Sequence, residues 1–320
     1  MIYDLIILGG GPAGAAAAIY AARKRLKTLL ITESFGGQSI VSDDIQNWIG
    51  EKHISGFDLA KKFEDHVKYF SNIIETKIPE KAISMWKHQN LETSNKDIRT
   101  FKIKTDVSEY ETKTVILAIG AHRRKLNILG EQKFEGKGVA YCSTCDAPLF
   151  EGKKVAVIGG GNAGLEAVVD LFSYASHITL LIRGEEMKGD PATQEEINKN
   201  SKVEIIFNAD IKEILGDKFV AGLRYEDSKT KEVKELVLEG IFVEIGSVPN
   251  SEIAKDLVEL DQWGQIKIDS KWGTTSCPGI FAAGDITDDP YKQNNISAGD
   301  AVKAALAAYN YILKIKKDFP

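Results

Sequence analysis

The sequence predicts an α/β fold that contains two dinucleotide-binding units. The first observation behind this prediction is a glycine-rich motif between a short apolar run and an alanine-rich stretch, L-I-I-L-G-G-G-P-A-G at 5–14. The second is its recurrence as V-A-V-I-G-G-G-N-A-G at 155–164. A strand, a glycine loop and a helix in this order are typical of dinucleotide-binding α/β proteins. A length of 320 residues suggests about two domains.

The N-terminal unit has every part of a dinucleotide-binding βαβ motif. Residues 3–8 predict a buried parallel strand, the alanine-rich stretch predicts a helix, and residues 27–33 predict the second strand. The motif glycines are Gly9, Gly11 and Gly14. They allow a tight turn, close approach to a pyrophosphate and close helix–strand packing. Glu33 ends the second strand, where a carboxylate can accept hydrogen bonds from ribose hydroxyls.

The second unit repeats the glycines but lacks the acid. Its motif positions are Gly159, Gly161 and Gly164. The second strand is predicted at 177–182, and Ile182 stands where an acidic residue is expected. Arg183 and Lys188 follow, and two interpretations are open. They either pair with a 2′-phosphate or are solvated surface cations, which is the default for these residue types.

The rest of the chain completes the two units. Residues 84–118 and 203–245 contain short alternating runs that predict β meanders, and a helix is predicted at about 297–315. Strand ends followed by turns make Ala118–Gly120 and Gly246–Pro249 the expected crossover points between domains.

The composition excludes several classes of protein. The chain has 41 basic and 46 acidic residues, which gives a net charge of −5 and no basic surface for nucleic acid or an anionic membrane. The N-terminal residues predict no signal peptide, and no apolar window of about eighteen residues predicts a membrane span. Three cysteines do not make a disulfide scaffold, so a cytoplasmic location is expected.

Two of the cysteines lie close together in Y-C-S-T-C-D, as Cys142 and Cys145. A structural zinc site needs about four ligands, and no second pair accompanies this one, so no metal is expected. A purely structural bridge across so short a loop constrains the unfolded chain little. A redox pair fits better, because the spacing brings two sulfurs together and the surroundings can lower the pKa of one thiol. Cys277 is expected to be a buried small hydrophobe without a role.

The residues around the pair suggest redox chemistry. Asp146 follows directly, and its carboxyl can supply the proton that thiol–disulfide exchange requires or can cap a helix that follows. Two dinucleotide sites suggest a flavin and a nicotinamide cofactor, with hydride passing between them.

Six short motifs occur in an order that resembles a known family. They are G-G-G-P-A-G at 9–14, F-G-G-Q at 35–38, C-S-T-C-D at 142–146, G-G-G-N-A-G at 159–164, G-S-V-P-N at 246–250, and F-A-A-G-D with Y-K-Q within 281–293. Over essentially its whole length the chain resembles the low-molecular-weight thioredoxin reductases, class II pyridine nucleotide-disulfide oxidoreductases. It is equally similar to the reductase portion of the flavoprotein subunit of alkyl hydroperoxide reductase, which has an additional N-terminal thioredoxin-like region.

The resemblance implies a role for each matching residue. The residues that would hold FAD are Gly9, Gly11, Gly14, Glu33, Gln38, Asn47, Asp285, Gln293 and Asn294. The residues that would hold the nicotinamide dinucleotide are Gly159, Gly161 and Gly164. Cys145 matches the cysteine nearer the flavin, Cys142 the one that attacks the partner's disulfide, and Asp146 the proton donor.

The resemblance also implies the architecture and the activity. We expect two Rossmann-like nucleotide-binding domains of three-layer ββα architecture, the second inserted into the first. The FAD-binding domain would comprise 1–118 and 248–320, and the NAD(P)-binding domain with its C-x-x-C would comprise 119–247. The members are homodimers that alternate two domain arrangements. Electrons would pass from NAD(P)H to FAD, to Cys142 and Cys145, and then to the disulfide of a thioredoxin-like protein.

The electron donor is where the chain departs from the family pattern. NADPH-dependent reductases have H-R-R-x-x-x-R where this chain has I-R-G-E-E-M-K, so that only Arg183 and, as a lysine, Lys188 are retained. The peroxide-reductase type has an acid at the position of Ile182. NADPH and NADH both stay open as donors. The alternatives are an NADH-dependent reductase of a peroxidase system, a ferredoxin-dependent enzyme, which the intact glycines disfavour, an oxidase, or a binding protein that kept the fold.

Overall fold

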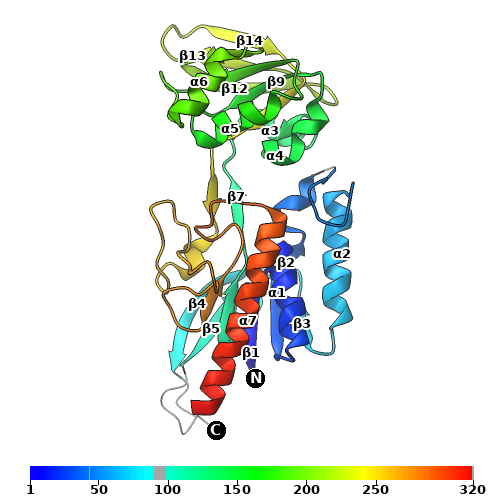
Figure 1. The fold of residues 1–320 in the computed structure, drawn as a ribbon, viewed down its shortest axis with the longest axis vertical. Helices are drawn as coiled ribbons and strands as arrows, with labels where there is room; N and C mark the ends of the chain where they lie inside the picture. Colours follow the sequence, from blue (N-terminus) through cyan, green and yellow to red (C-terminus); the bar gives the residue numbers. More distant parts are fainter. Residues whose placement is uncertain (43, 90–98, 319–320) are drawn as a thin grey trace. The chain divides into compact units, whose positions relative to one another are not determined.

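The computed structural model describes residues 1–42, 44–89 and 99–318. The chain forms two compact units. The first comprises 1–40, 48–122 and 248–320, and the second comprises 41–47 and 123–247. The chain enters the second unit through strand β7 (Ala121–Arg123) and leaves it through β16 (Ser247–Pro249), and these two strands pair. Figure 1 follows the chain from blue to red, so that each unit can be traced by itself.

The first unit is built on a sheet in the order β3-β2-β1-β6-β5-β4, with β17 paired to the end of β6. The parallel strands are β1 (Ile2–Gly10), β2 (Thr28–Phe35), β3 (Ile74–Lys77), β6 (Glu109–Leu117) and β17 (Ile280–Ala282). The antiparallel strands are β4 (Ala82–Gln89) and β5 (Arg99–Thr105). The side chains of Leu5 to Leu8 in β1 are fully buried, as expected for a central parallel strand covered on both faces.

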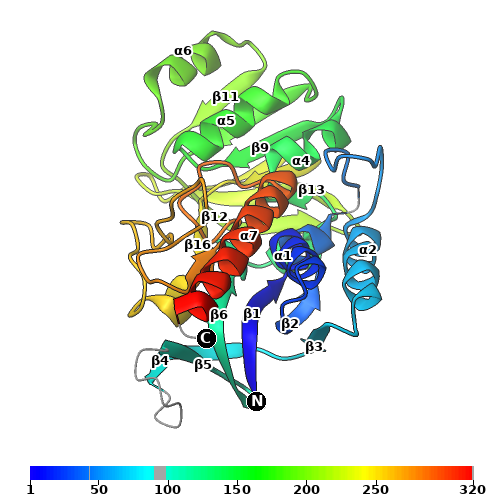
Figure 2. The same ribbon diagram turned by 60° about the horizontal axis from the view of Figure 1, so that its bottom comes forward.

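Helices of the first unit position the end of the glycine loop. Helix α1 (Pro12–Arg23) packs along α7 (Asn294–Asp318), and α2 (Gly56–Tyr69) lies beyond α1 (Figures 1 and 2). Both packed helices bury alanines, including Ala18 and Ala304, and small side chains allow helix axes to approach closely. The close packing fixes where the N-termini of α1 and α7 lie.

The second unit has three layers. Its parallel sheet, in the order β11-β10-β9-β15-β8, consists of β8 (Val139–Ala140), β9 (Lys154–Ile158), β10 (His177–Leu181), β11 (Val203–Ile206) and β15 (Gly240–Val243). The antiparallel sheet consists of β12 (Ala209–Gly216), β13 (Val220–Asp227) and β14 (Val233–Val237). The helical layer consists of α5 (Asn162–Leu171) and α6 (Pro191–Lys199).

Alternate side chains of the parallel strands supply the two cores of this unit. Ile158 and Leu181 pack toward the antiparallel sheet, whereas Val157 and Leu180 pack toward the helices. This period of two is what a strand covered on both faces requires. The predicted α/β fold with its ββα layers is confirmed.

The bounds of several elements differ from the predictions. The C-terminal helix runs over Asn294–Asp318, whereas 297–315 was expected. Helices α2 and α6 have no counterpart among the predicted elements, although each has a capping residue. Ser55 Oγ accepts the N–H of Asp58 at 3.0 Å, and Asp190 Oδ2 accepts the N–H of Thr193 at 3.1 Å. Across 1–42, 44–89 and 99–318, every helix is too short or too polar to cross a membrane.

Candidate active site

The first glycine loop joins β1 to α1 and leaves no space for side chains at its motif positions Gly9 and Gly14. Gly9 has a φ of +107°, and a Cβ there would lie 2.3 Å from the carbonyl oxygen of Ala118. A Cβ on Gly14 would lie 1.8 Å from the carbonyl oxygen of Gly9. At Gly11, which begins the helix, a Cβ would meet nothing nearer than 3.7 Å. The loop lies where β1 separates β2 from β6, the switch point at which open α/β sheets bind ligands.

Asp285 lies beside the first turns of both packed helices. Ser297 Oγ, in the first turn of α7, donates a hydrogen bond to Asp285 Oδ1 at 3.2 Å. The preceding residue, Gly284, has a φ of +79°, and a Cβ there would lie 3.2 Å from the Cβ of Ala13 and from Ser297 Oγ. The glycine therefore brings Asp285 close to the N-terminus of α1, where the first glycine loop ends.

Two more predicted residues gather at the start of α7. Asn294 Oδ1 accepts a hydrogen bond from Ser39 Oγ at 2.8 Å, which ties the short helix η1 (Gly37–Val41) to α7. The carbonyl of Gln293 accepts the N–H of Ser297 at 2.9 Å. The neighbouring Lys292, for which no role is predicted, donates a hydrogen bond from Nζ to the carbonyl of Thr287 at 2.6 Å. Burial lowers the pKa of Lys292, against the nearby aspartates that raise it.

Three predicted residues are exposed. Glu33 stands in β2 with a side chain that is 63% exposed, and it pairs with Lys81 at 3.1 Å. Gln38 is exposed in η1. Asn47 is also exposed and belongs to the 41–47 segment of the second unit. The structure thus gathers the loop glycines, Asp285, Gln293 and Asn294 within the first unit and leaves these three side chains on the surface.

The second glycine loop reproduces the first. Gly159 has a φ of +141°, and a Cβ there would lie 2.2 Å from the carbonyl oxygen of Glu244. A Cβ on Gly164 would lie 2.1 Å from the carbonyl oxygen of Gly159. Gly161 begins α5 with nothing within 4 Å of an added Cβ. The repeated motif therefore produces a repeated backbone geometry.

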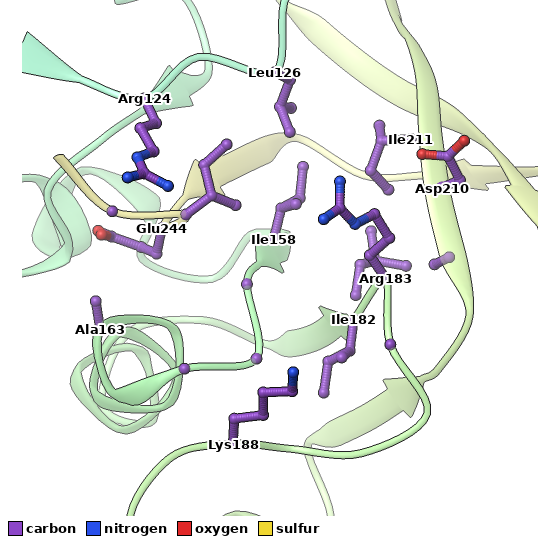
Figure 3. A pocket seen from close by; sticks show the side chains of 18 of the residues that line it. Arg124, Leu126, Ile158, Ala163, Ile182, Arg183, Lys188, Asp210, Ile211 and Glu244 are labelled. Atoms are coloured by element: carbon purple, nitrogen blue, oxygen red, sulfur yellow. The ribbon is translucent and has the colours of Figure 1, made fainter. Parts of the chain in front are cut away.

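A cavity of about 740 Å³ opens at the second loop. Its wall includes the loop glycines, Arg183, Lys188 and Glu244, and Figure 3 shows Ile158, Leu126 and Ile211 on its apolar side. The backbone N–H of Lys188 donates to the carbonyl of Gly160 at 2.7 Å, which holds the segment after β10 against the loop. Neither Arg183 nor Lys188 has a side-chain partner among the described residues. The segment after β10 thus brings these two cations to the cavity.

Cys142 and Cys145 form a disulfide in the second unit, with 5.3 Å between their Cα atoms. Helix α4 (Ser143–Asp146) forms the turn between and after them, and the N–H of Asp146 donates to the carbonyl of Cys142 at 3.0 Å. Asp146 ends this turn and makes no side-chain cap to the following short helix η2 (Ala147–Phe150), so the capping interpretation is wrong. Asp170 of α5 accepts hydrogen bonds from Ser143 Oγ at 2.8 Å and from Thr144 Oγ1 at 3.3 Å.

A buried carboxyl, Glu244, was not predicted as a site residue. It follows β15, and its Oε1 accepts the backbone N–H of Ser143 at 3.3 Å. Burial raises the pKa of Glu244 to about 7, although Arg123, with Nη1 4.0 Å from Oε2, and the Ser143 N–H act in the opposite direction. The signal in the sequence is a single acid in the apolar run G-I-F-V-E-I-G at 240–246.

A second buried acid, Glu131, links the cavity wall to Tyr141, the residue before Cys142. Glu131 accepts the N–H groups of Leu126 at 2.9 Å and Asn127 at 2.7 Å, and the hydroxyl of Tyr141 at 3.0 Å. Burial and this carboxylate raise the pKa of Tyr141 well above its usual value. Among the described residues no group of His, Cys, Asp and Glu could hold a metal ion, and Cys277 is buried and unpaired.

Comparison with known proteins agrees with this arrangement. The chain matches the model of the pyridine nucleotide-disulphide oxidoreductase family over residues 3–307. It is 44% identical over 312 residues to an NADH dehydrogenase of Bacillus subtilis (strain 168). It is 43% identical over 314 residues to the F subunit of alkyl hydroperoxide reductase of Pseudomonas putida. Each alignment covers 98% of this chain but only 59% and 58%, respectively, of these longer relatives.

A solved structure is similar over its full length. The thioredoxin reductase of Streptococcus pyogenes MGAS5005 superposes with a TM-score of 0.88 and is 32% identical, and the match covers 98% of this chain and 99% of that one. A glycine loop in each unit, a cavity at the second loop and a disulfide in the same unit are features of a dinucleotide-dependent disulfide oxidoreductase. The chain belongs to the pyridine nucleotide-disulphide oxidoreductase family.

Proposed function

We propose that this protein uses NADH or NADPH to reduce the disulfide of a thioredoxin-like protein, with electrons passing through FAD to Cys142 and Cys145. The observation that supports this most is the disulfide in the same unit as the dinucleotide cavity. The family implies FAD and a pyridine nucleotide. The choice of partner is our proposal.

We assign FAD to the first unit, and the geometry of its glycine loop supports this. Its glycine loop excludes side chains from the backbone at Gly9 and Gly14 and has room at Gly11, where a pyrophosphate would approach the helix N-terminus. The residues proposed to hold FAD are Gly9, Gly11, Gly14, Glu33, Gln38, Asn47, Asp285, Gln293 and Asn294. When bound, FAD supplies two-electron transfer between the nicotinamide dinucleotide and the disulfide.

The second unit would hold the nicotinamide dinucleotide. Gly159, Gly161 and Gly164 shape the loop, and Arg183 and Lys188 offer positive charge to a 2′-phosphate. Ile182, which is buried, removes the carboxylate that would accept from a 2′-hydroxyl. Anaerobic bleaching of the flavin with NADH, NADPH and reduced ferredoxin side by side tests this assignment. Bleaching by ferredoxin alone would contradict it.

The reduced cysteine pair would act by thiol–disulfide exchange. Cys142 attacks the partner's disulfide, which forms a mixed disulfide and releases one partner thiolate, and Asp146 gives that thiolate a proton. Cys145 then loses its thiol proton and attacks the sulfur of Cys142, which re-forms the Cys142–Cys145 bond and releases the second partner thiolate, and that thiolate takes up the proton. The cysteine pair has then lost two electrons, and the partner has gained the same two.

The sequence relatives favour a second candidate, an NADH-dependent reductase of a peroxidase system. Its support is the 44% and 43% identity to proteins named NADH dehydrogenase and the F subunit of alkyl hydroperoxide reductase, of which this chain spans 59% and 58%. Turnover with a free thioredoxin-like protein and with an oxidised thiol peroxidase, supplied separately, distinguishes the two. Reduction of the peroxidase alone would replace the first candidate with the second.

The central test is Cys145→Ser in the FAD-loaded protein. Reduction of the protein disulfide should disappear, while flavin reduction by the nicotinamide dinucleotide persists. Cys277→Ser, which removes the third, buried cysteine, is the matched control and should keep both activities. Undiminished disulfide reduction by Cys145→Ser would refute the proposal. The homodimer and the cytoplasmic location stay predictions, which sedimentation and cell fractionation would test.

A further inference from the structure

Glu244 lies where the dinucleotide cavity and the disulfide turn share a wall. The residue is 7% exposed, and it lines the cavity on the same side as Arg124 (Figure 3). Its Oε1 also accepts the backbone N–H of Ser143, the residue that follows Cys142, at 3.3 Å. A single carboxyl therefore touches the backbone of the redox turn and the space proposed for the dinucleotide.

The fold does not need a carboxyl at this position. The carbonyl oxygen of Glu244 faces Gly159 and would lie 2.2 Å from a Cβ added there. In the first unit the carbonyl oxygen of Ala118 faces Gly9 in the same way, at 2.3 Å from an added Cβ. In both loops the glycine contacts only the backbone of the facing residue, so the fold accepts an alanine there, as Ala118 shows in the first loop. Burying a carboxyl is unfavourable unless it is well paired, so its presence in the second unit calls for a role outside the loop.

The charged groups around Glu244 come from each element packed against it. Arg123 of β7 has Nη1 4.0 Å from Oε2, and Arg124 stands on the cavity wall. Asp146 of α4 and Asp170 of α5 add negative charge nearby. Burial is the largest influence and raises the pKa of Glu244 to about 7. The charge of this side chain therefore changes within the physiological range.

We propose that Glu244 is a positioning residue that holds the Cys142–Cys145 turn and, through its own charge, sets the reactivity of the reduced thiols. The inference rests on the proposed function, in which these thiols attack a partner's disulfide. An ionised Glu244 places negative charge one residue from Cys142, which disfavours a thiolate there and raises the pKa of that thiol. Protonation of Glu244 removes this opposition.

The test measures thiol reactivity without turnover. The full FAD-loaded chain is reduced anaerobically with dithiothreitol, desalted and treated with iodoacetamide at several pH values, and alkylation of Cys142 and Cys145 is followed by mass spectrometry. No dinucleotide, catalytic turnover or partner protein is involved, so a failure here is distinct from a failure of the proposed function.

Glu244→Gln keeps an oxygen for the Ser143 N–H but carries no charge. At pH 8 it should alkylate Cys142 about tenfold faster than wild type, which corresponds to about one pKa unit. At pH 5.5 the two rates should agree, because wild-type Glu244 is then protonated. Equal rates at pH 8 would overturn the proposal, and so would the same difference at both pH values, which would indicate altered geometry alone.

Two controls separate charge from geometry. Glu186→Gln removes a carboxylate from the same cavity wall away from the turn and should leave the alkylation profile unchanged. Ser143→Ala loses the hydrogen bond to Asp170 without a change of charge, so any effect should be independent of pH. If Glu244→Gln does not fold, the wild-type profile decides. The proposal requires that profile to be broader than a single-proton titration, and a single-proton curve would refute it.

Discussion

The two glycine loops of this chain share a backbone and differ in the side chains around it. In both, the first glycine faces a carbonyl oxygen that would lie 2.2–2.3 Å from a Cβ, and the third faces the carbonyl of the first. At the end of the second strand, however, the first unit has the exposed Glu33 and the second has the buried Ile182. Opposite the first glycine stand Ala118 and Glu244. The repeated motif therefore determines the backbone of both loops, whereas the side chains around them differ, and we propose that these side chains adapt each loop to its own ligand.

The largest effect should come from adding a methyl group to the third glycine of each loop. Gly14→Ala and Gly164→Ala would place a Cβ 1.8 and 2.1 Å from a backbone oxygen. Helix and strand must then separate, at about 3 kcal/mol or more. We expect Gly14→Ala to lose flavin absorbance at about 450 nm on purification. We expect Gly164→Ala to keep the flavin and lose its reduction by NADH and NADPH.

The middle glycines provide the matched control for this comparison. A Cβ at Gly11 or Gly161 meets nothing closer than 3.7 Å, so these alanine variants should fold like wild type. They should still weaken binding of the respective cofactor, because the methyl group obstructs close approach of the pyrophosphate. If Gly164→Ala retains full dinucleotide-dependent flavin reduction, the second loop is not the dinucleotide site.

The next effect follows from the contrast between Ala118 and Glu244 and concerns how the free energy of unfolding depends on pH. The pKa of Glu244 is raised from 4.5 to about 7 in the folded protein. The folded state therefore binds this proton more tightly than the unfolded chain. The resulting stability is fully present below about pH 4.5 and is lost as the pH rises through about 7, by about 3 kcal/mol.

Glu244→Gln should remove this dependence. The free energy of unfolding of the variant, measured relative to that of the wild type, should be larger at pH 8 than at pH 5. The reason is that no buried carboxylate forms in the variant. Guanidinium unfolding of both proteins at the two pH values measures the difference. A loss of stability between pH 5 and 8 that is equal in the two proteins would show that other groups are responsible.

A smaller effect, on the KM for the dinucleotide, should come from the residues that follow the second strand of the second unit. Replacing both Arg183 and Lys188 with alanine removes two cations of the cavity that have no side-chain partner among the described residues. The KM for NADPH should rise about tenfold, equivalent to about 1.4 kcal/mol, while the KM for NADH changes little. Lys229→Ala, which removes a cation paired with Glu185 at 3.0 Å outside the cavity, is the control. Parallel changes for both dinucleotides would show that the cations are solvated surface charges.

The smallest effect should come from the helix caps, one at the start of α2 in the first unit and one at the start of α6 in the second. Ser55→Ala and Asp190→Ala each remove a side-chain acceptor of a backbone N–H and should destabilise their own unit by about 1 kcal/mol. Separate thermal transitions or hydrogen exchange of the two helices would report the loss. No loss in either variant would mean that packing alone holds these helix starts.

Much of the fold could be predicted because its signals are local. Apolar runs before each glycine motif, the alanine-rich helix and the C-x-x-C pair are all read within a few residues, and the structure has a strand, a helix or a disulfide at each. Helices α2 and α6 lie outside those motifs, and their capping residues Ser55 and Asp190 were the available signals. Asp146 was open to two interpretations because the helix after it could not be located from spacing alone.

Local sequence was sufficient for the two loops, because a glycine that faces a backbone oxygen is required wherever a strand turns into a helix this tightly. Three-dimensional folding was needed to bring Glu244 to Ser143, 101 positions away, and to bring Arg183 and Lys188 to one cavity with it. Those contacts depend on the order of strands in the sheet, in which β15 lies beside β9. Strand order arises from long-range packing, so no short stretch of the sequence reveals it.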